Sequence, residues 1–190
     1  MSILGLIEFR AITPGMVATD AMVKRAPVTV LETAPLDPGG YLTIITGDLA
    51  CVEEAVDAGC LSGGAALVRG VVLANLHDAV IPALKGEVSR PEPGAMGIVE
   101  TVDCVAAVHA ADAACKAAPV ALYTLHLARH IGGKGYMVFV GELPDVAAAE
   151  DAARETAGGA LVESTVIPQP DEAFFAQVLQ PTVLRKLGER

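Results

Sequence analysis

Strand patterns and helix patterns alternate along the first half of the chain. Apolar residues 3–9 predict a buried strand, and Thr13-Pro14-Gly15 opens a helix that ends near Arg25. Further strands are predicted at 28–33, 41–46 and 65–73, and further helices at 49–58, with Asp48 as N-cap, and at 77–84. The order β-α-β-β-α-β plus a helix predicts an α/β domain of the α+β type, the ferredoxin-like split βαβ fold, with helices packed on one face of a four-stranded sheet.

The second half of the chain repeats the first. At an offset of 92 residues the identical pairs include Gly5 and Gly97, Glu8 and Glu100, Asp20 and Asp112, and Lys24 and Lys116. After a length change of two residues between the second and third strands, the offset becomes 94, as in Gly47 and Gly141. The repeat predicts two tandem, unpermuted domains at 1–85 and 95–180, joined by a linker at 86–94 and followed by a tail at 181–190.

Composition excludes several classes of protein. The net charge of −10 argues against nucleic-acid binding, which needs a basic face. No apolar run is long enough for a membrane span, and Glu8 and Arg10 interrupt the N-terminal apolar stretch too early for a signal peptide, so we expect a cytoplasmic protein. The cysteines form no CxxC pair and no zinc spacing, so we expect them to be free and mostly buried: Cys51, Cys60, Cys104 and Cys115.

The sequence offers no constellation for catalysis. It contains no nucleophile–base pair, no metal-ligand set and no phosphate-binding loop, so we expect that the protein is not an enzyme. His109 and His126 fall in a predicted helix and a predicted strand, without an acid or nucleophile around them, and are interpreted as structural or surface residues. Because Glu8 recurs as Glu100, a structural role as buried partners at domain contacts is favoured over catalysis.

Repeated motifs carry a family resemblance. The motifs are Gly5-Leu6-Ile7-Glu8, Asp20-Ala21-x-x-Lys24-x-Ala26-x-Val28, their second-half equivalents, Val138-Phe139-Val140-Gly141-Glu142 and Val166-Ile167-Pro168-Gln169-Pro170. Over about residues 2–180 the chain resembles the bacterial microcompartment (BMC) shell-protein family, in its tandem-domain, trimer-forming branch. The resemblance implies a pseudohexameric homotrimer that forms a tile of the microcompartment shell. It also implies other shell proteins as partners at the tile edges and small metabolites at a central pore.

The resemblance also assigns residues. It implies that the loops between the second and third strands of each domain face the pore, namely Asp37, Pro38, Gly39 and Gly40, and Ile131, Gly132, Gly133 and Lys134. It implies tile-edge roles for Lys24, Lys116, Asn75 and Gln169, although the last two stand near positions where single-domain members often carry an arginine. Some tandem members hold an iron–sulphur cluster through a pore-loop cysteine. Here that position is Asp37, a poor cluster ligand, so we expect no cofactor.

Three interpretations of Asp37 remain open at this point. Asp37 is a plain turn residue, or it lines a cation-favouring pore without bound metal, or it binds a metal weakly. His130 and Lys134 either pair with acids near the pore or are solvated. The alternative function is a small-molecule-binding regulatory module with tandem ferredoxin-like domains, and a redox conduit is a further one. The repeated lysine motif favours the shell tile.

Overall fold

The computed structural model describes residues 2–128 and 130–178, which form two compact units. The first unit holds the residues up to Leu76 together with Asp103–Val105 and Ala128–Gly133. The second unit holds His77–Val102, Ala106–Leu127 and the described residues from Lys134 to Val178. Arg129, which belongs to the second predicted pore loop, and the predicted tail at 181–190 lie outside the described residues.

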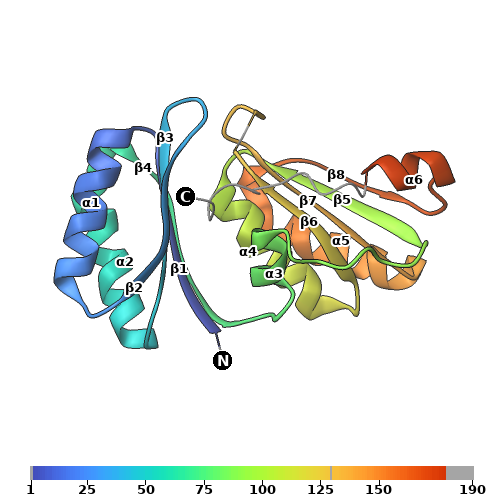
Figure 1. The fold of residues 1–190 in the computed structure, drawn as a ribbon, viewed down its shortest axis with the longest axis horizontal. Helices are drawn as coiled ribbons and strands as arrows, with labels where there is room; N and C mark the ends of the chain where they lie inside the picture. Colours follow the sequence, from blue (N-terminus) through green and yellow to red (C-terminus); the bar gives the residue numbers. More distant parts are fainter. Residues whose placement is uncertain (1, 129, 179–190) are drawn as a thin grey trace. The chain divides into compact units, whose positions relative to one another are not determined.

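The first unit is a four-stranded antiparallel sheet with two helices on one face (Figure 1). Its strand order is β2-β3-β1-β4, which is the ferredoxin-like order that the sequence predicts. Its elements are β1 (Ser2–Phe9), α1 (Ile12–Arg25), β2 (Thr29–Leu36), β3 (Gly40–Thr46), α2 (Leu49–Gly63), the short 3-10 helix η1 (Gly64–Ala66) and β4 (Leu67–Leu76).

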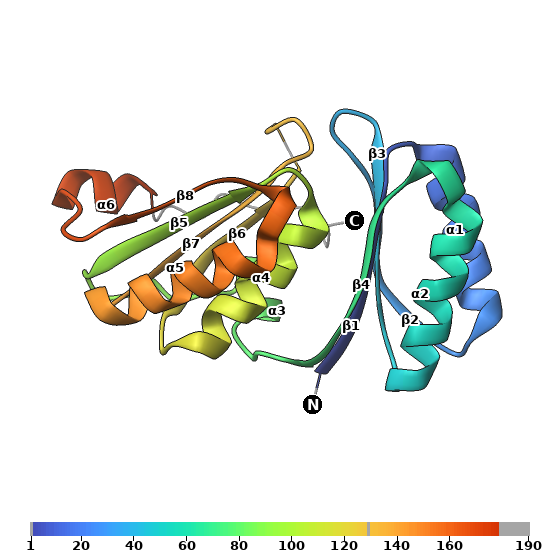
Figure 2. The ribbon, with the colours of Figure 1, turned by 180° about the vertical axis from the view of Figure 1, so that it is seen from behind.

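The second unit repeats this sheet with the order β6-β7-β5-β8. Figure 2 shows α5 along one face of this sheet. The elements from the end of the first sheet onward are α3 (Val80–Lys85), β5 (Ala95–Thr101), α4 (Cys104–Ala117), β6 (Ala121–Leu127), β7 (Gly135–Gly141), α5 (Leu143–Ala157), η2 (Gly158–Ala160), β8 (Leu161–Ile167) and α6 (Glu172–Val178). Two unpermuted copies of one fold are therefore confirmed, while the exact domain and linker bounds stay predictions.

The core of the first unit fills the space between its sheet and its two helices. Ile7 and Phe9 of β1 pack with Met22 of α1 and Val52 of α2 in one buried cluster. The packing is close, because a Cβ added to Gly63 would lie 2.2 Å from the ring of Phe9. A side chain at position 63 would push α2 away from β1, so the glycine allows the two elements to lie this close.

In the second unit a helix also covers the opposite face of the sheet. Phe175 of α6 is buried in a cluster with Met96, Tyr123 and Val138. On β5 the side chain of Met96 points away from the face where a Cβ on Gly97 would meet Phe139, because neighbouring strand residues alternate between faces. The sequence predicted helices on one face only, and the apolar side chains on the other face explain the additional cover.

The ends of β2 and α2 differ from the sequence prediction. Strand β2 does not end at residue 33 but runs to Leu36, which pairs with Gly40. Pro35 does not break the strand, because β2 is an edge strand, where a proline is tolerated. Helix α2 continues to Gly63 instead of ending at residue 58. Asp48 is the N-cap residue of α2, as predicted, but its side chain makes no capping hydrogen bond.

No helix among the described residues is long and apolar enough to cross a membrane.

Candidate functional site

The turn between β2 and β3 is the first of the two predicted pore loops. It holds Asp37, Pro38 and Gly39, and Gly40 begins β3. Gly39 has a φ of 114°, a left-handed value that favours glycine, and its N–H donates a hydrogen bond to the Leu36 carbonyl at 2.7 Å. This hydrogen bond closes the turn, and Asp37 and Pro38 are exposed at its tip.

The second predicted pore loop joins β6 to β7. It includes Ile131, Gly132 and Gly133, followed by Lys134. Gly132 and Gly133 have φ values of 69° and 85°, and the neighbouring His130 is also left-handed at 61°. A run of left-handed residues makes this loop tight, which explains why two consecutive glycines stand in it.

The two loops lie side by side within the first unit. The Asp37 carboxylate accepts a hydrogen bond from the backbone N–H of His130 at 3.2 Å. A Cβ added to Gly133 would lie 2.9 Å from the Asp37 carbonyl oxygen, so this glycine permits the close approach. Of the two basic residues considered for pairing with acids, Lys134 does so, with 2.9 Å between its Nζ and a Glu100 carboxylate oxygen.

A buried carboxylate caps helix α4 in the first unit. Glu8 of β1 is 6% exposed, and its Oε2 accepts a hydrogen bond from the backbone N–H of Cys104 at 2.8 Å. Burial raises the pKa of Glu8 to about 7, and the nearby charge of Asp103 adds to the rise. The burial of Glu8 agrees with the sequence interpretation, which gave this repeated glutamate a structural role.

An ion pair holds the same helix end. Asp103 is 2% exposed, and both of its carboxylate oxygens accept hydrogen bonds from Nε of Arg69 on β4, at 2.9 and 3.1 Å. A buried carboxylate without this cation would be costly, so the pair fixes the first turn of α4 against the end of the first sheet. Sequence reasoning did not find this contact.

The two predicted edge lysines each pair with an aspartate one turn earlier. Lys24 Nζ lies 2.6 Å from a carboxylate oxygen of Asp20, and Lys116 pairs with Asp112 in the same way. The environments differ, because Asp112 is buried and also accepts a hydrogen bond from the backbone N–H of His77 at 2.8 Å. Lys24 and Asp20 are exposed, as the edge role requires of a contact residue.

The other two predicted edge residues stand at the ends of equivalent strands. Asn75 lies near the end of β4 with a left-handed φ of 54°, and Gln169 follows β8. Both are exposed. Their place at a tile edge stays a prediction, as do the pore and edge roles of all the residues that the resemblance assigned.

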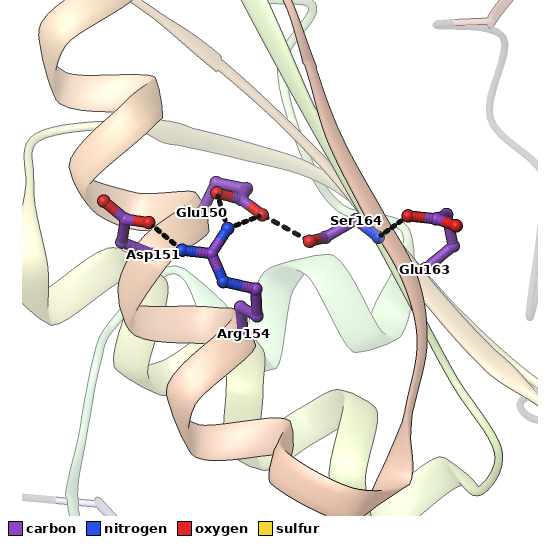
Figure 3. A network of polar contacts seen from close by, with 5 residues as sticks. All are labelled: Glu150, Asp151, Arg154, Glu163 and Ser164. Carbon is purple, nitrogen blue, oxygen red and sulfur yellow. Dashed lines mark hydrogen bonds and ion pairs between the residues drawn. The ribbon is translucent and has the colours of Figure 1, made fainter.

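A polar network that sequence reasoning missed joins α5 to β8 (Figure 3). Glu150 is buried, and its carboxylate accepts two hydrogen bonds from Nη1 of Arg154, each at 3.1 Å, and one from the Ser164 hydroxyl. Arg154 also pairs with Asp151. In the first repeat the matching positions are Val56, Cys60, Gly70 and Asp57. Each repeat therefore fills the gap between its second helix and its last strand with different chemistry.

His109, His126 and the four cysteines are all at least partly buried. The ring of His126 stacks on Tyr136 with 5.3 Å between ring centres, and His109 is half-buried. All four cysteines are free, with Cys51 and Cys60 half-buried and Cys104 and Cys115 buried. Among the described residues, no three His, Cys, Asp or Glu side chains lie close enough together to hold a metal ion.

Comparison with known proteins decides the family. The BMC domain matches the chain twice, at residues 4–76 and 95–170. The bacterial microcompartment shell protein PduT of Citrobacter freundii is 41% identical over 179 residues, which are 93% of this chain and 97% of that protein. The chain belongs to the bacterial microcompartment shell-protein family.

Other members of this family support the same fold and role. The shell protein EutK of Escherichia coli is 34% identical over half of each chain. A microcompartment protein from Desulfitobacterium hafniense matches with a TM-score of 0.78, at 34% identity over 91% of this chain and 97% of that one. A fused permuted hexameric shell protein matches with a TM-score of 0.60 at 27% identity, over 82% of this chain and 83% of that one. This protein is thus a structural component of a microcompartment shell, and the regulatory-module alternative is not favoured.

The contacts missed by sequence reasoning left one signal in the repeat. Where the first copy has Arg69, the second has Glu163, and where the second copy has Asp103, the first has Ala11. Both partners of the Arg69–Asp103 ion pair therefore lack a counterpart in the other repeat. A matched pair of departures from an otherwise good repeat indicates a contact made once in the chain.

Proposed function

We propose that three copies of this chain close into a pseudohexameric tile of the shell, with the two loops around Asp37 and Gly133 at its central axis. Two copies of the BMC domain in each chain support this, because three chains then supply six similar domains around one axis. The contact between the two loops supports it too, because loops that line one pore must lie together.

Asp37 gives the proposed pore its chemistry. Its carboxylate is exposed at the tip of the turn, so a threefold axis at this turn gathers three carboxylates. Such a ring attracts cations and repels anions, which favours passage of small cationic or neutral metabolites. An Asp at this position also supports a tile without an iron–sulphur cluster, because such clusters take thiolate ligands.

The tile has a structural role and no catalytic one in this proposal. Lys24 and Lys116 meet neighbouring shell proteins at its edges, with Asn75 and Gln169 beside them. The exposure of Lys24 supports this role, since its side chain is 73% exposed. Replacing both lysines by alanine is expected to leave the trimer intact and to abolish its assembly into sheets under the electron microscope.

Sedimentation equilibrium tests the proposal directly. We expect a species of three times the 19.4 kDa chain mass at micromolar concentration. A stable monomer contradicts the tile. Absorbance near 400 nm and iron content test the cofactor part separately, and a purified protein that carries iron and absorbs there contradicts the expected lack of a cluster.

A further inference from the structure

Within the first unit, the end of a sheet meets the start of a helix. Glu8 and Arg69 stand on the sheet, and they bind the N–H of Cys104 and the carboxylate of Asp103 at the start of α4. The contact joins two different surfaces, one from each repeat. The contact is heterologous, because it uses the sheet of the first repeat and the helix of the second. The helix start of the first repeat and the sheet end of the second repeat therefore have no such partner within the chain. In a closed assembly, further copies of the chain supply these partners.

The first of these surfaces is the start of α1, which corresponds to the start of α4. The N-cap of α1 is Ala11, whose methyl side chain cannot accept a hydrogen bond and so cannot cap this helix. Its first turn holds no acidic residue either. The first N–H groups of a helix need acceptors and favour a negative charge, and in α4 that acceptor is Glu8.

The face of α1 that follows this start is exposed and apolar. Met16 is 52% exposed and Val17 is 58% exposed, whereas Val108, the counterpart of Met16 on α4, is fully buried. The same contrast runs along the helices for Ile12 and Cys104, Thr13 and Val105, Asp20 and Asp112, and Val23 and Cys115. Residues Ile12, Met16 and Val17 are called the α1 face below.

The second unpartnered surface is the end of the second sheet. Glu100 occupies the position of Glu8, is half-buried and carries a carboxylate at 2.9 Å from Lys134. Glu163 occupies the position of Arg69 and is exposed. Both sheet ends therefore carry a glutamate that can cap a helix. They differ at the second position, where the second sheet has the anionic Glu163 and the first sheet has a cation.

We propose that the α1 face docks on the end of the second sheet of another copy of this chain, where Glu100 caps α1 and Glu163 pairs with Arg10. This rests on the trimer proposed above and names the surfaces that build it. Arg10 immediately precedes the Ala11 N-cap and is exposed, so its charge complements Glu163. Inside a chain the sheet carries the cation, Arg69, and the helix start carries the anion, Asp103. Between chains the charges are exchanged. A helix start therefore meets a like charge if it docks on the wrong sheet, which disfavours that docking.

Two substitutions of exposed apolar residues test the surface. Val17→Asp places a charge on the α1 face, and Leu61→Asp makes the same change on α2, where the side chain is 85% exposed. In sedimentation equilibrium we expect the Val17 variant to dissociate to monomers at concentrations where the wild type and the Leu61 variant remain trimers. Far-UV circular dichroism checks that both variants keep their helices.

A charge swap tests the orientation of the contact. Arg10→Glu and Glu163→Arg alone each bring like charges together, and each is expected to raise the concentration for half-dissociation of the trimer at least tenfold. The double variant restores the pair with reversed sense and should recover most of this loss. Because the pair lies between chains, the recovery depends on assembly and is absent from any measurement on a monomer.

The outcomes separate this inference from the proposed function. A wild-type monomer overturns both. A wild-type trimer that tolerates Val17→Asp as well as it tolerates Leu61→Asp overturns only the docking surface. Independent, additive losses from the two charge variants overturn the Arg10–Glu163 pair.

Discussion

Replacing Glu8 by glutamine tests the buried carboxylate at the start of α4. The amide keeps an oxygen that accepts the Cys104 N–H hydrogen bond, and it removes the titration. Burial raises the pKa of Glu8 from its ordinary 4.5 to about 7. At pH values between these two, Glu8 is protonated in the folded chain and ionised in the unfolded chain. Stability from this group is therefore complete below pH 4.5 and is lost as the pH rises through 7.

The size of the effect follows from the two pKa values. One pKa unit corresponds to about 1.4 kcal/mol, and between pH 5 and pH 8 the wild type loses about 2.5 kcal/mol through Glu8. The Glu8→Gln variant does not incur this loss. Its free energy of unfolding is therefore expected to rise relative to the wild type by about 2.5 kcal/mol between these two pH values.

Urea unfolding at a fixed protein concentration measures this difference at pH 5, 6, 7 and 8. Keeping the concentration fixed matters because assembly contributes to apparent stability. Glu53→Gln, at an exposed position on α2, is the matched control and should follow the wild type at every pH. The reasoning is refuted if the Glu8 variant runs parallel to the wild type, because Glu8 would then titrate alike in both states.

Three further changes probe packing and burial. Gly97→Ala should cost at least about 2 kcal/mol in urea unfolding, because the added Cβ would lie 2.2 Å from the Phe139 ring; a neutral change would mean that the sheet can shift to admit it. Burial raises the pKa of Cys115 to about 12 and that of Cys104 well above its usual range, so both thiols should resist Ellman's reagent at pH 8 until urea is added, and rapid native labelling of either would contradict their burial. Ser164→Ala removes a hydroxyl that donates to the buried carboxylate of α5 and should lower stability by about 1 kcal/mol in the same unfolding assay, and an unchanged midpoint would show that this hydrogen bond contributes nothing.

The repeat made much of the fold predictable. Gly5, Glu8 and Lys24 have identical counterparts, so one interpretation of strands and helices served both halves. The β-α-β-β-α-β order then predicted the two four-stranded sheets that the structure shows. The limits lay at element ends, where α2 runs on to Gly63 because its packing against Phe9, a residue far away in sequence, favours another turn.

The candidate site was less predictable because its contacts are not local. Glu8 and Cys104 are 96 residues apart, and Arg69 and Asp103 are 34 apart, so no helix or strand period joins them. The family resemblance assigned the loop of Asp37, but it did not supply the hydrogen bond from the His130 backbone. In the sequence, the Arg69–Asp103 pair shows only as two departures from the repeat, and the fold is needed to join them.

A cryo-electron microscopy map of the assembled protein tests the central claim most directly. The account predicts three chains around a threefold axis, with the Asp37 turns nearest that axis and the α1 face covered by a neighbouring chain. Threefold particles with Asp37 at the outer rim, or an assembly that leaves Met16 and Val17 exposed to solvent, would contradict it.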